Sequence, residues 1–149
     1  MDNIKLAFNT PTPKKLKTIC VVEDNPMEQT MIVDYFGKYK DLVIKAFSDG
    51  ESCIKEIVKS NISPDLILLD YFLDSTVVTS KDGLEIMEKL KELSPNSNFI
   101  MLTSVENDRI KSLASKKGIL GYIIKDKTSY DRLDSIIEGN FSVEADPSY

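Results

Sequence analysis

The stretch Ser63-Pro64-Asp65-Leu66-Ile67-Leu68-Leu69-Asp70 decides the fold of this 149-residue chain. A proline stands near its start, an unbroken aliphatic run follows, and a carboxylate ends it. Such a run is typical of a short strand buried on both faces, as in the middle of a parallel sheet. The last residue of such a strand lies at the carboxyl edge of the sheet, where open α/β folds bind their ligands. We therefore expect Asp70 to be the chemical centre, although a lone Asp after a strand is more often a turn or cap residue.

The rest of the chain alternates between apolar runs and amphipathic segments. We expect strands at 18–22, 42–47, 66–69, 98–103 and 120–125, and helices after them near 26–36, 51–58, 84–93, 105–117 and 128–138. A long loop, 71–81, separates the third strand from its helix. This alternation predicts one parallel sheet with helices on both faces, which is a doubly wound α/β fold.

The two ends of the chain differ from this pattern. Residues 1–16 contain two prolines and the start of a small basic run, and we expect them to be a mobile leader without a fold. We expect the domain to span residues 17–139, with 140–149 as a polar tail that is too short for a second domain.

Composition excludes several classes of protein. The net charge of −5 provides no basic field for nucleic acid, and no apolar run approaches the roughly 18 residues of a membrane span. The first residues do not have the pattern of a secretory signal. Cys20 and Cys53 lie in apolar patterns, so we expect buried thiols in a reducing cytoplasm rather than a disulfide.

The chain contains no histidine. This excludes Ser-His triads, histidine-ligated zinc and histidine general bases. Any bound metal must be held by oxygen ligands, which favours hard cations such as Mg²⁺. A covalent nucleophile would have to be a carboxylate, hydroxyl, amine or thiol.

Reactive side chains follow four of the five expected strands. These are Glu23 and Asp24, then Asp70, Thr103 and Lys125, and in a parallel sheet they share one edge. Clustered carboxylates repel one another and call for a divalent cation. One carboxylate could then attack a phosphoryl group, while Lys125 and Thr103 stabilise the phosphoryl oxygens. Taken singly, the acidic pair is commonly a helix cap, the Thr a turn residue and the Lys a solvated side chain.

With these residues in place, the chain resembles the receiver domains of bacterial two-component response regulators over about residues 17–139. The motifs that carry the resemblance are Val21-Val22-Glu23-Asp24, Leu68-Leu69-Asp70, Asp82-Gly83-Leu84-Glu85, Met101-Leu102-Thr103-Ser104 and Tyr122-Ile123-Ile124-Lys125. The resemblance implies a flavodoxin-like, doubly wound sheet of five parallel strands in the order 2-1-3-4-5.

The resemblance also implies the chemistry of the site. Asp70 would accept a phosphoryl group from a histidine kinase or a histidine phosphotransfer protein. Mg²⁺ or Mn²⁺ would be held by Glu23, Asp24, Asp70 and the backbone carbonyl of Phe72. The absence of histidine fits a protein that only receives the group. It would catalyse its own phosphorylation and slow dephosphorylation, not metabolic turnover.

Further roles follow from the same resemblance. Thr103 and Tyr122 would be the switch pair, in which the hydroxyl moves toward the phosphoryl group and the ring fills the vacated space. Phe72, Ser104 and Val105 would flank the phosphoryl group. Bulky Phe72 and Val105 would hinder attacking water, and small Ser104 would leave the entry path open.

Three features depart from the family pattern. Asp126 follows the lysine, where the family usually has a proline. The segment from Asp70 to Gly83 is longer than usual by about one helical turn, and it carries Asp74 where a proline is customary. The acidic pair begins with Glu23 rather than Asp, and a Glu reaches further toward the metal.

The output surface would comprise the helix at 105–117, the strand at 120–125 and the helix at 128–138. The basic residues there are Arg109, Lys111, Lys116 and Lys117, which are equally consistent with a solvated face. A downstream protein or a phosphorylation-dependent second copy would read this surface, or the phosphoryl group would be relayed onward. Alternatives are a Mg²⁺-dependent phosphohydrolase using Asp70 and Asp74, whose spacing is unfavourable, and an unphosphorylated interaction module. A flavin site is disfavoured because Glu23 and Asp24 would repel a phosphate.

Overall fold

A parallel sheet forms the centre of the computed structural model, which describes residues 12–70, 83–104 and 106–149. Along the chain the main elements are β2 (Thr18–Val22), α2 (Pro26–Phe36), β3 (Val43–Phe47), α3 (Gly50–Ser60), β4 (Leu66–Asp70), α4 (Gly83–Leu93), β5 (Asn98–Thr103), α5 (Asp108–Lys116), β6 (Gly121–Ile124) and α6 (Ser129–Asn140). The strand order is β3-β2-β4-β5-β6, and every neighbouring pair is parallel. Numbered along the chain, these strands have the order 2-1-3-4-5, which confirms the expected doubly wound fold.

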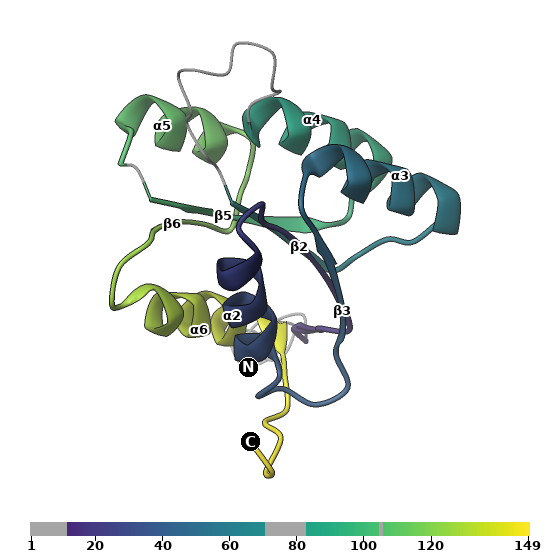
Figure 1. Cartoon of the computed structure of the whole chain (residues 1–149), viewed down its shortest axis with the longest axis vertical. Helices are drawn as coiled ribbons and strands as arrows, with labels where there is room; N and C mark the ends of the chain where they lie inside the picture. Colours follow the sequence, from purple (N-terminus) through teal and green to yellow (C-terminus); the bar gives the residue numbers. More distant parts are fainter. Residues whose placement is uncertain (1–11, 71–82, 105) are drawn as a thin grey trace, which may run out of the picture.

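Helices cover both faces of the sheet (Figure 1). On β4, Leu66 and Leu68 belong to the core under α2 and α6, whereas Ile67 and Leu69 belong to the core under α3, α4 and α5. Because successive side chains of a strand point to opposite faces, a strand between two helical layers needs apolar residues at every position. This requirement explains the unbroken aliphatic run of the central stretch.

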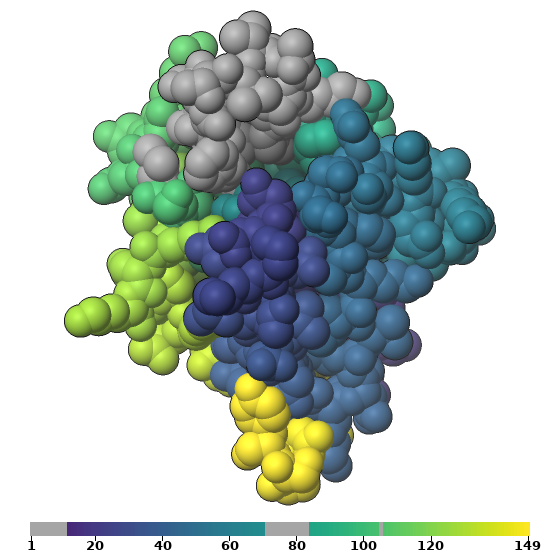
Figure 2. All heavy atoms as spheres, viewed as in Figure 1, coloured from purple at the N-terminus to yellow at the C-terminus, as the bar shows by residue number. Residues whose placement is uncertain are grey.

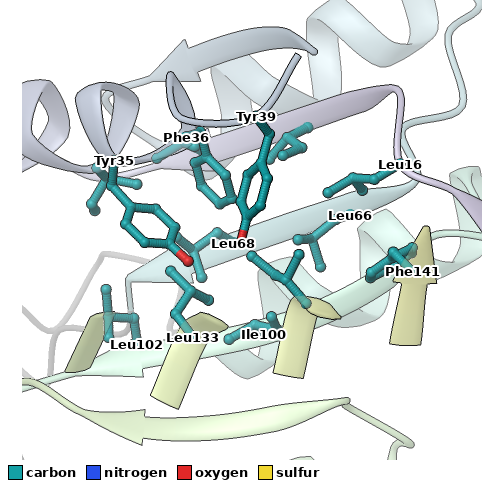
Figure 3. Packing of buried hydrophobic residues seen from close by; sticks show 14 of the residues in the cluster. Leu16, Tyr35, Phe36, Tyr39, Leu66, Leu68, Ile100, Leu102, Leu133 and Phe141 are labelled. Carbon is teal, nitrogen blue, oxygen red and sulfur yellow. The ribbon is translucent and has the colours of Figure 1, made fainter. Parts of the chain in front are cut away.

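Figure 3 shows how the core under α2 and α6 is filled. Phe36 of α2 is completely buried and lies in the same cluster as Leu68, Ile100 and Leu133. The other core contains the thiols of Cys20 and Cys53, which are free and buried as expected. Within residues 12–70, 83–104 and 106–149, no helix has the length and hydrophobicity needed to cross a membrane.

Side-chain caps fix where the helices begin. The Asn25 side chain accepts hydrogen bonds from the backbone N–H groups of Met27 and Glu28, both at 3.0 Å, and Pro26 occupies the first helical turn. Asn107 caps α5 in the same manner, so this helix begins at Asp108 and not at 105 as we expected. The first cap starts α2 immediately after the acidic pair and holds that pair at the sheet edge.

The chain ends are more ordered than we expected. Two short strands, β1 (Lys14–Lys15) and β7 (Phe141–Ser142), pair in parallel as a second small sheet. Leu16 and Phe141 are buried in the core under α2 and α6. The expectations of an unfolded leader and a polar tail are therefore wrong for residues 14–16 and 141–142. The division of the chain into domains stays a prediction.

The last residues also contact α2. The Asp146 backbone N–H donates to the Lys38 carbonyl at 2.7 Å, and the Tyr149 hydroxyl donates to the Asp34 carbonyl at 2.7 Å. In Figure 2 these yellow residues lie against the end of the dark blue helix α2. The C-terminal segment thus follows the end of α2 that is farther from the acidic pair.

Candidate functional site

Three carboxylates meet at the carboxyl edge of the sheet. β2 and β4 are neighbours with Val22 opposite Leu69, so the residues that follow these two, Glu23 and Asp70, come side by side. One carboxylate oxygen from each of Glu23, Asp24 and Asp70 lies within 4.8 Å of the others. The expected convergence of the strand ends is confirmed for these residues.

Burial gives this cluster unusual electrostatics. Glu23 is buried, and the Asp70 side chain is only 7% exposed, whereas Asp24 is exposed. Burial raises the pKa of Glu23 to about 9, and hydrogen bonds to the Asp70 and Glu28 carboxyl groups contribute in the same direction. At neutral pH the cluster without a metal ion therefore retains a proton on Glu23, because adjacent carboxylates cannot all ionise cheaply in a buried site.

Lys125 supplies the positive charge. Its Nζ lies 3.0 Å from Glu23 Oε1, 3.1 Å from Asp70 Oδ1 and 2.8 Å from Glu28 Oε2. Burial alone would lower the pKa of Lys125, but the hydrogen bonds with Glu28 and Glu23 and the charge of Asp70 outweigh burial and raise this pKa. The ammonium is therefore charged at any physiological pH. Its backbone N–H donates to the Thr103 carbonyl at 2.7 Å, which fixes Lys125 to the neighbouring strand.

Thr103 and Tyr122 occupy the neighbouring strands. Thr103 ends β5 one residue beyond Leu102, the partner of Asp70 in the ladder, and it is completely buried. Tyr122 lies on β6, half-buried, and packs against the core under α3, α4 and α5. Burial raises the pKa of Tyr122, and a hydrogen bond to the Asn107 backbone opposes the shift. Ser104 is exposed next to Thr103.

Some expected site residues cannot be placed. Phe72, Val105 and Asp74 lie outside the described residues, as does the longer segment at 71–82. The predicted carbonyl ligand and the predicted flanking side chains of Phe72 and Val105 therefore stay predictions.

Asp126, where the family usually has a proline, organises the start of α6. Its carboxylate accepts hydrogen bonds from the backbone N–H and the hydroxyl of Thr128, at 2.7 and 2.8 Å, and pairs with Arg132 at 2.6 Å. These bonds, led by the Thr128 hydroxyl, lower the pKa of Asp126 to about 2. An Asp turn of this kind fixes the chain after Lys125 by hydrogen bonds instead of a proline ring.

Glu28 is the site residue that sequence reasoning missed. It lies in the first turn of α2, and its carboxylate binds Lys125 rather than solvent alone. A signal was present in the sequence. Glu28 is the third residue of a helix that starts at the end of β2, so its side chain lies at the same sheet edge as the acidic pair.

The donor set fits a hard divalent cation. Carboxylate oxygens from Glu23, Asp24 and Asp70 converge within the reach of one ion, and such oxygens are the protein ligands that Mg²⁺ prefers. In the described part of the chain, the Lys125 ammonium contacts two carboxyl groups of this cluster. One ammonium does not neutralise the carboxylates of the cluster, so a dication is electrostatically favoured there.

Comparisons with known proteins agree with this arrangement. Residues 19–138 match the family model of the response regulator receiver domain. The chain is 29% identical over 120 residues to the nitrate/nitrite response regulator protein NarL of Escherichia coli K12, covering 80% of this chain and 52% of NarL. It is 31% identical over 119 residues to the response regulator protein VraR of Staphylococcus saprophyticus, covering 79% of this chain and 54% of VraR. The chain thus spans about half the length of these relatives.

Solved structures share the fold. The phosphorylated cyanobacterial phytochrome response regulator RcpA superposes with a TM-score of 0.69 at 20% identity, over 87% of this chain and 99% of RcpA. The isolated REC domain of RcsB from Salmonella enterica, solved in the presence of BeF₃⁻, has a TM-score of 0.69 at 19% identity, over 86% of this chain and 93% of that domain. At identities of 19% and 20%, this likeness shows a shared fold.

Proposed function

Because the chain belongs to the response regulator receiver domain family, we propose that it is the phosphoacceptor of a two-component phosphorelay. In this proposal Asp70 takes a phosphoryl group from a histidine kinase or a histidine phosphotransfer protein in the cytoplasm. The observation that carries the proposal is the contact of Lys125 with Asp70 at 3.1 Å, inside a cluster of carboxylates from a neighbouring strand end. The contact joins residues from β4 and the end of β6, which a generic turn or cap role for Asp70 does not require.

The transfer is a nucleophilic displacement at phosphorus. An Asp70 carboxylate oxygen forms the new P–O bond while the bond from phosphorus to the donor atom breaks, and the departing donor atom keeps the electron pair and takes up a proton. The charge on the equatorial oxygens needs donors that are already in place. Lys125 provides the ammonium, and we assign the Thr103 hydroxyl to the same group of oxygens.

The metal ligands follow from the donor set. Glu23, Asp24 and Asp70 would hold Mg²⁺ or Mn²⁺, and the Phe72 carbonyl is the proposed backbone ligand. A bound dication supplies charge neutralisation to the phosphoryl oxygens. Glu23 must give up its retained proton before it can ligate, so metal binding releases a proton at neutral pH.

Incubation with acetyl phosphate and Mg²⁺ tests the proposal. We expect the wild-type protein to gain the mass of one phosphoryl group. The Asp70→Asn variant is expected to gain none, because an amide is not a nucleophile toward phosphorus. A chelator should also prevent the gain in the wild type, which intact-protein mass spectrometry measures in the same series.

Two outcomes would contradict the proposal. A phosphoryl group that maps to another residue, or an Asp70→Asn variant that is still labelled, would remove Asp70 from the acceptor role. Multiple turnover of a small phosphomonoester by the wild type would favour the phosphohydrolase instead.

A substitution at Ser104 tests the entry path to Asp70. We expect Ser104→Phe to slow phosphorylation by about tenfold, a barrier increase of about 1.4 kcal/mol, because a ring would crowd the approach to the carboxylate. The rate from acetyl phosphate is the measurement, and Ser135→Phe, on the exposed outer face of α6, is the control. Equal rates for Ser104→Phe and the wild type would show that this path is not beside Ser104.

We assign the output to the surface of α5, β6 and α6, with Thr103 and Tyr122 as the switch pair. Arg109, Lys111 and Lys116 are exposed there, whereas Lys117 forms an ion pair with Glu88 of α4. A covalent phosphate must favour one arrangement by only a few kcal/mol to shift such a surface. A downstream protein, or a second copy of the chain after phosphorylation, is the proposed reader, with no direct contact to nucleic acid or membrane.

A further inference from the structure

Glu28 is a fourth carboxylate at the site, outside the three proposed metal ligands. We propose that Glu28 is a positioning residue, which binds the Lys125 ammonium in the unphosphorylated protein and yields it to the phosphoryl group. This inference rests on the proposed role of Asp70 as phosphoacceptor. Glu28 would act only through Lys125, and it is not expected to touch phosphorus.

The first observation is that Glu28 does not make the capping hydrogen bond that is common at its helical position. A Glu at the third helical position commonly turns back to accept a hydrogen bond from the N-cap backbone N–H. In α2 the N–H of the N-cap residue Asn25 donates instead to Glu23 Oε2, at 3.3 Å. Glu28 is thereby left to bind Lys125, a residue 97 positions away in the chain, at 2.8 Å.

The second observation is the saturation of Lys125. An ammonium has three N–H donors, and carboxylate oxygens of Glu23, Glu28 and Asp70 lie at 3.0, 2.8 and 3.1 Å from Nζ. The contact with Glu28 is the shortest. A phosphoryl oxygen that binds Lys125 must therefore displace one of these carboxylates or share a donor with it.

The third observation is the difference in exposure among the three partners. The Glu28 side chain is 45% exposed, compared with 0% for Glu23 and 7% for Asp70. A half-exposed carboxylate loses little when it returns to water, whereas a buried one would be left without a partner. Glu28 is consequently the partner that a phosphoryl group displaces.

The structure also leaves room for this displacement. Glu28 and Lys125 both line a cavity of about 180 Å³ between α2 and α6, together with Met31 and Leu133. The released Glu28 side chain can turn toward solvent, to which it is already 45% exposed. The exchange then requires rotation of one side chain and no change in the sheet.

Beryllofluoride, a phosphoryl mimic, provides the test at saturating Mg²⁺. We expect Glu28→Gln to bind beryllofluoride about three- to fivefold more tightly than the wild type, the scale of one half-exposed ion pair. Asp131→Asn is the matched control, because it removes an exposed carboxylate from the first turn of α6, whereas the carboxylates that contact Lys125 belong to other residues. Calorimetric titration measures all three proteins.

Two further measurements identify the route through Lys125. Without metal or beryllofluoride, the ¹⁵N resonance of the Lys125 ammonium should shift in Glu28→Gln and stay unchanged in Asp131→Asn. In a Lys125→Ala background, Glu28→Gln should no longer alter beryllofluoride affinity, since no ammonium remains to be released. A general effect of removing the Glu28 charge would not depend on whether Lys125 is present.

The outcomes separate this inference from the proposed function. If the wild type and Glu28→Gln bind beryllofluoride with equal affinity, the positioning role is overturned and the proposed function stays intact. An equal gain in Asp131→Asn, or an undiminished gain in the Lys125→Ala background, would also overturn it. No binding by the wild type at saturating Mg²⁺ would overturn both.

Discussion

Replacement of Lys125 by alanine is expected to slow phosphorylation of Asp70 by about 100- to 1,000-fold, the usual loss when one donor to developing oxyanion charge is removed. The ammonium contacts Asp70 at 3.1 Å, and the hydrogen bonds with Glu28 and Glu23 together with the charge of Asp70 keep it protonated. The rate of mass gain from acetyl phosphate and Mg²⁺ is the measurement. Lys127→Ala is the control, because Lys127 is an exposed cation two residues further along.

The same substitution should change the response to metal. Lys125→Ala removes the ammonium that contacts the Glu23 and Asp70 carboxyl groups. We expect Mg²⁺ to raise the unfolding temperature of this variant by more than it raises that of the wild type, because the dication then compensates a larger excess of negative charge. A variant that is phosphorylated at the wild-type rate would exclude Lys125 from the reaction.

Asp65→Ala is expected to lower the free energy of unfolding by about 3 kcal/mol, because two backbone N–H groups lose their charged acceptor. The Asp65 side chain is only 9% exposed and pairs with Lys14 at 2.7 Å. Its Oδ2 accepts hydrogen bonds from the backbone N–H groups of Lys17 and Thr18, at 2.9 and 3.0 Å. Urea unfolding followed by circular dichroism gives the difference, with Asp131→Ala as an exposed control.

The loss should depend on pH in one direction. Burial would raise the pKa of Asp65, but the Lys14 ion pair and the two backbone donors outweigh burial and lower it. Between the folded pKa and the unfolded value of about 3.9, the unfolded chain binds more protons, so this stabilisation falls as the pH falls. It is fully present above the unfolded pKa. The difference between wild type and Asp65→Ala should therefore shrink below about pH 4, and a constant difference would contradict the assignment.

The fold and most of the site follow from local patterns of the sequence. Aliphatic runs such as that of β4 predict buried strands, and the parallel arrangement predicts that the residues after them converge. Glu23, Asp24, Asp70 and Lys125 could be placed together by this reasoning, because each follows a strand directly. Glu28 was missed because it does not follow a strand directly, and its signal is its place in the first turn of α2, a helix that starts at this edge.

The chain ends could not be predicted for a different physical reason. β1 consists of two exposed lysines and has neither the length nor the alternation of a strand. Its structure comes from pairing with β7, at the other end of the chain. Leu16 is buried in the same cluster as Phe141, from the other end of the chain. Contacts between distant segments of this kind leave no local periodicity.

The C-terminal segment has a practical consequence. Tyr149 is held against Asp34 in the last turns of α2, while the first turn of that helix carries Glu28 beside Lys125. The two ends of α2 thus separate Tyr149 from the sheet edge that carries Asp70 (Figure 1). A fluorescent reporter or surface-immobilisation handle fused after Tyr149 would lie at the end of α2 remote from Asp70, so the proposed phosphorylation could be followed on labelled protein with the Asp70 carboxylate left unobstructed.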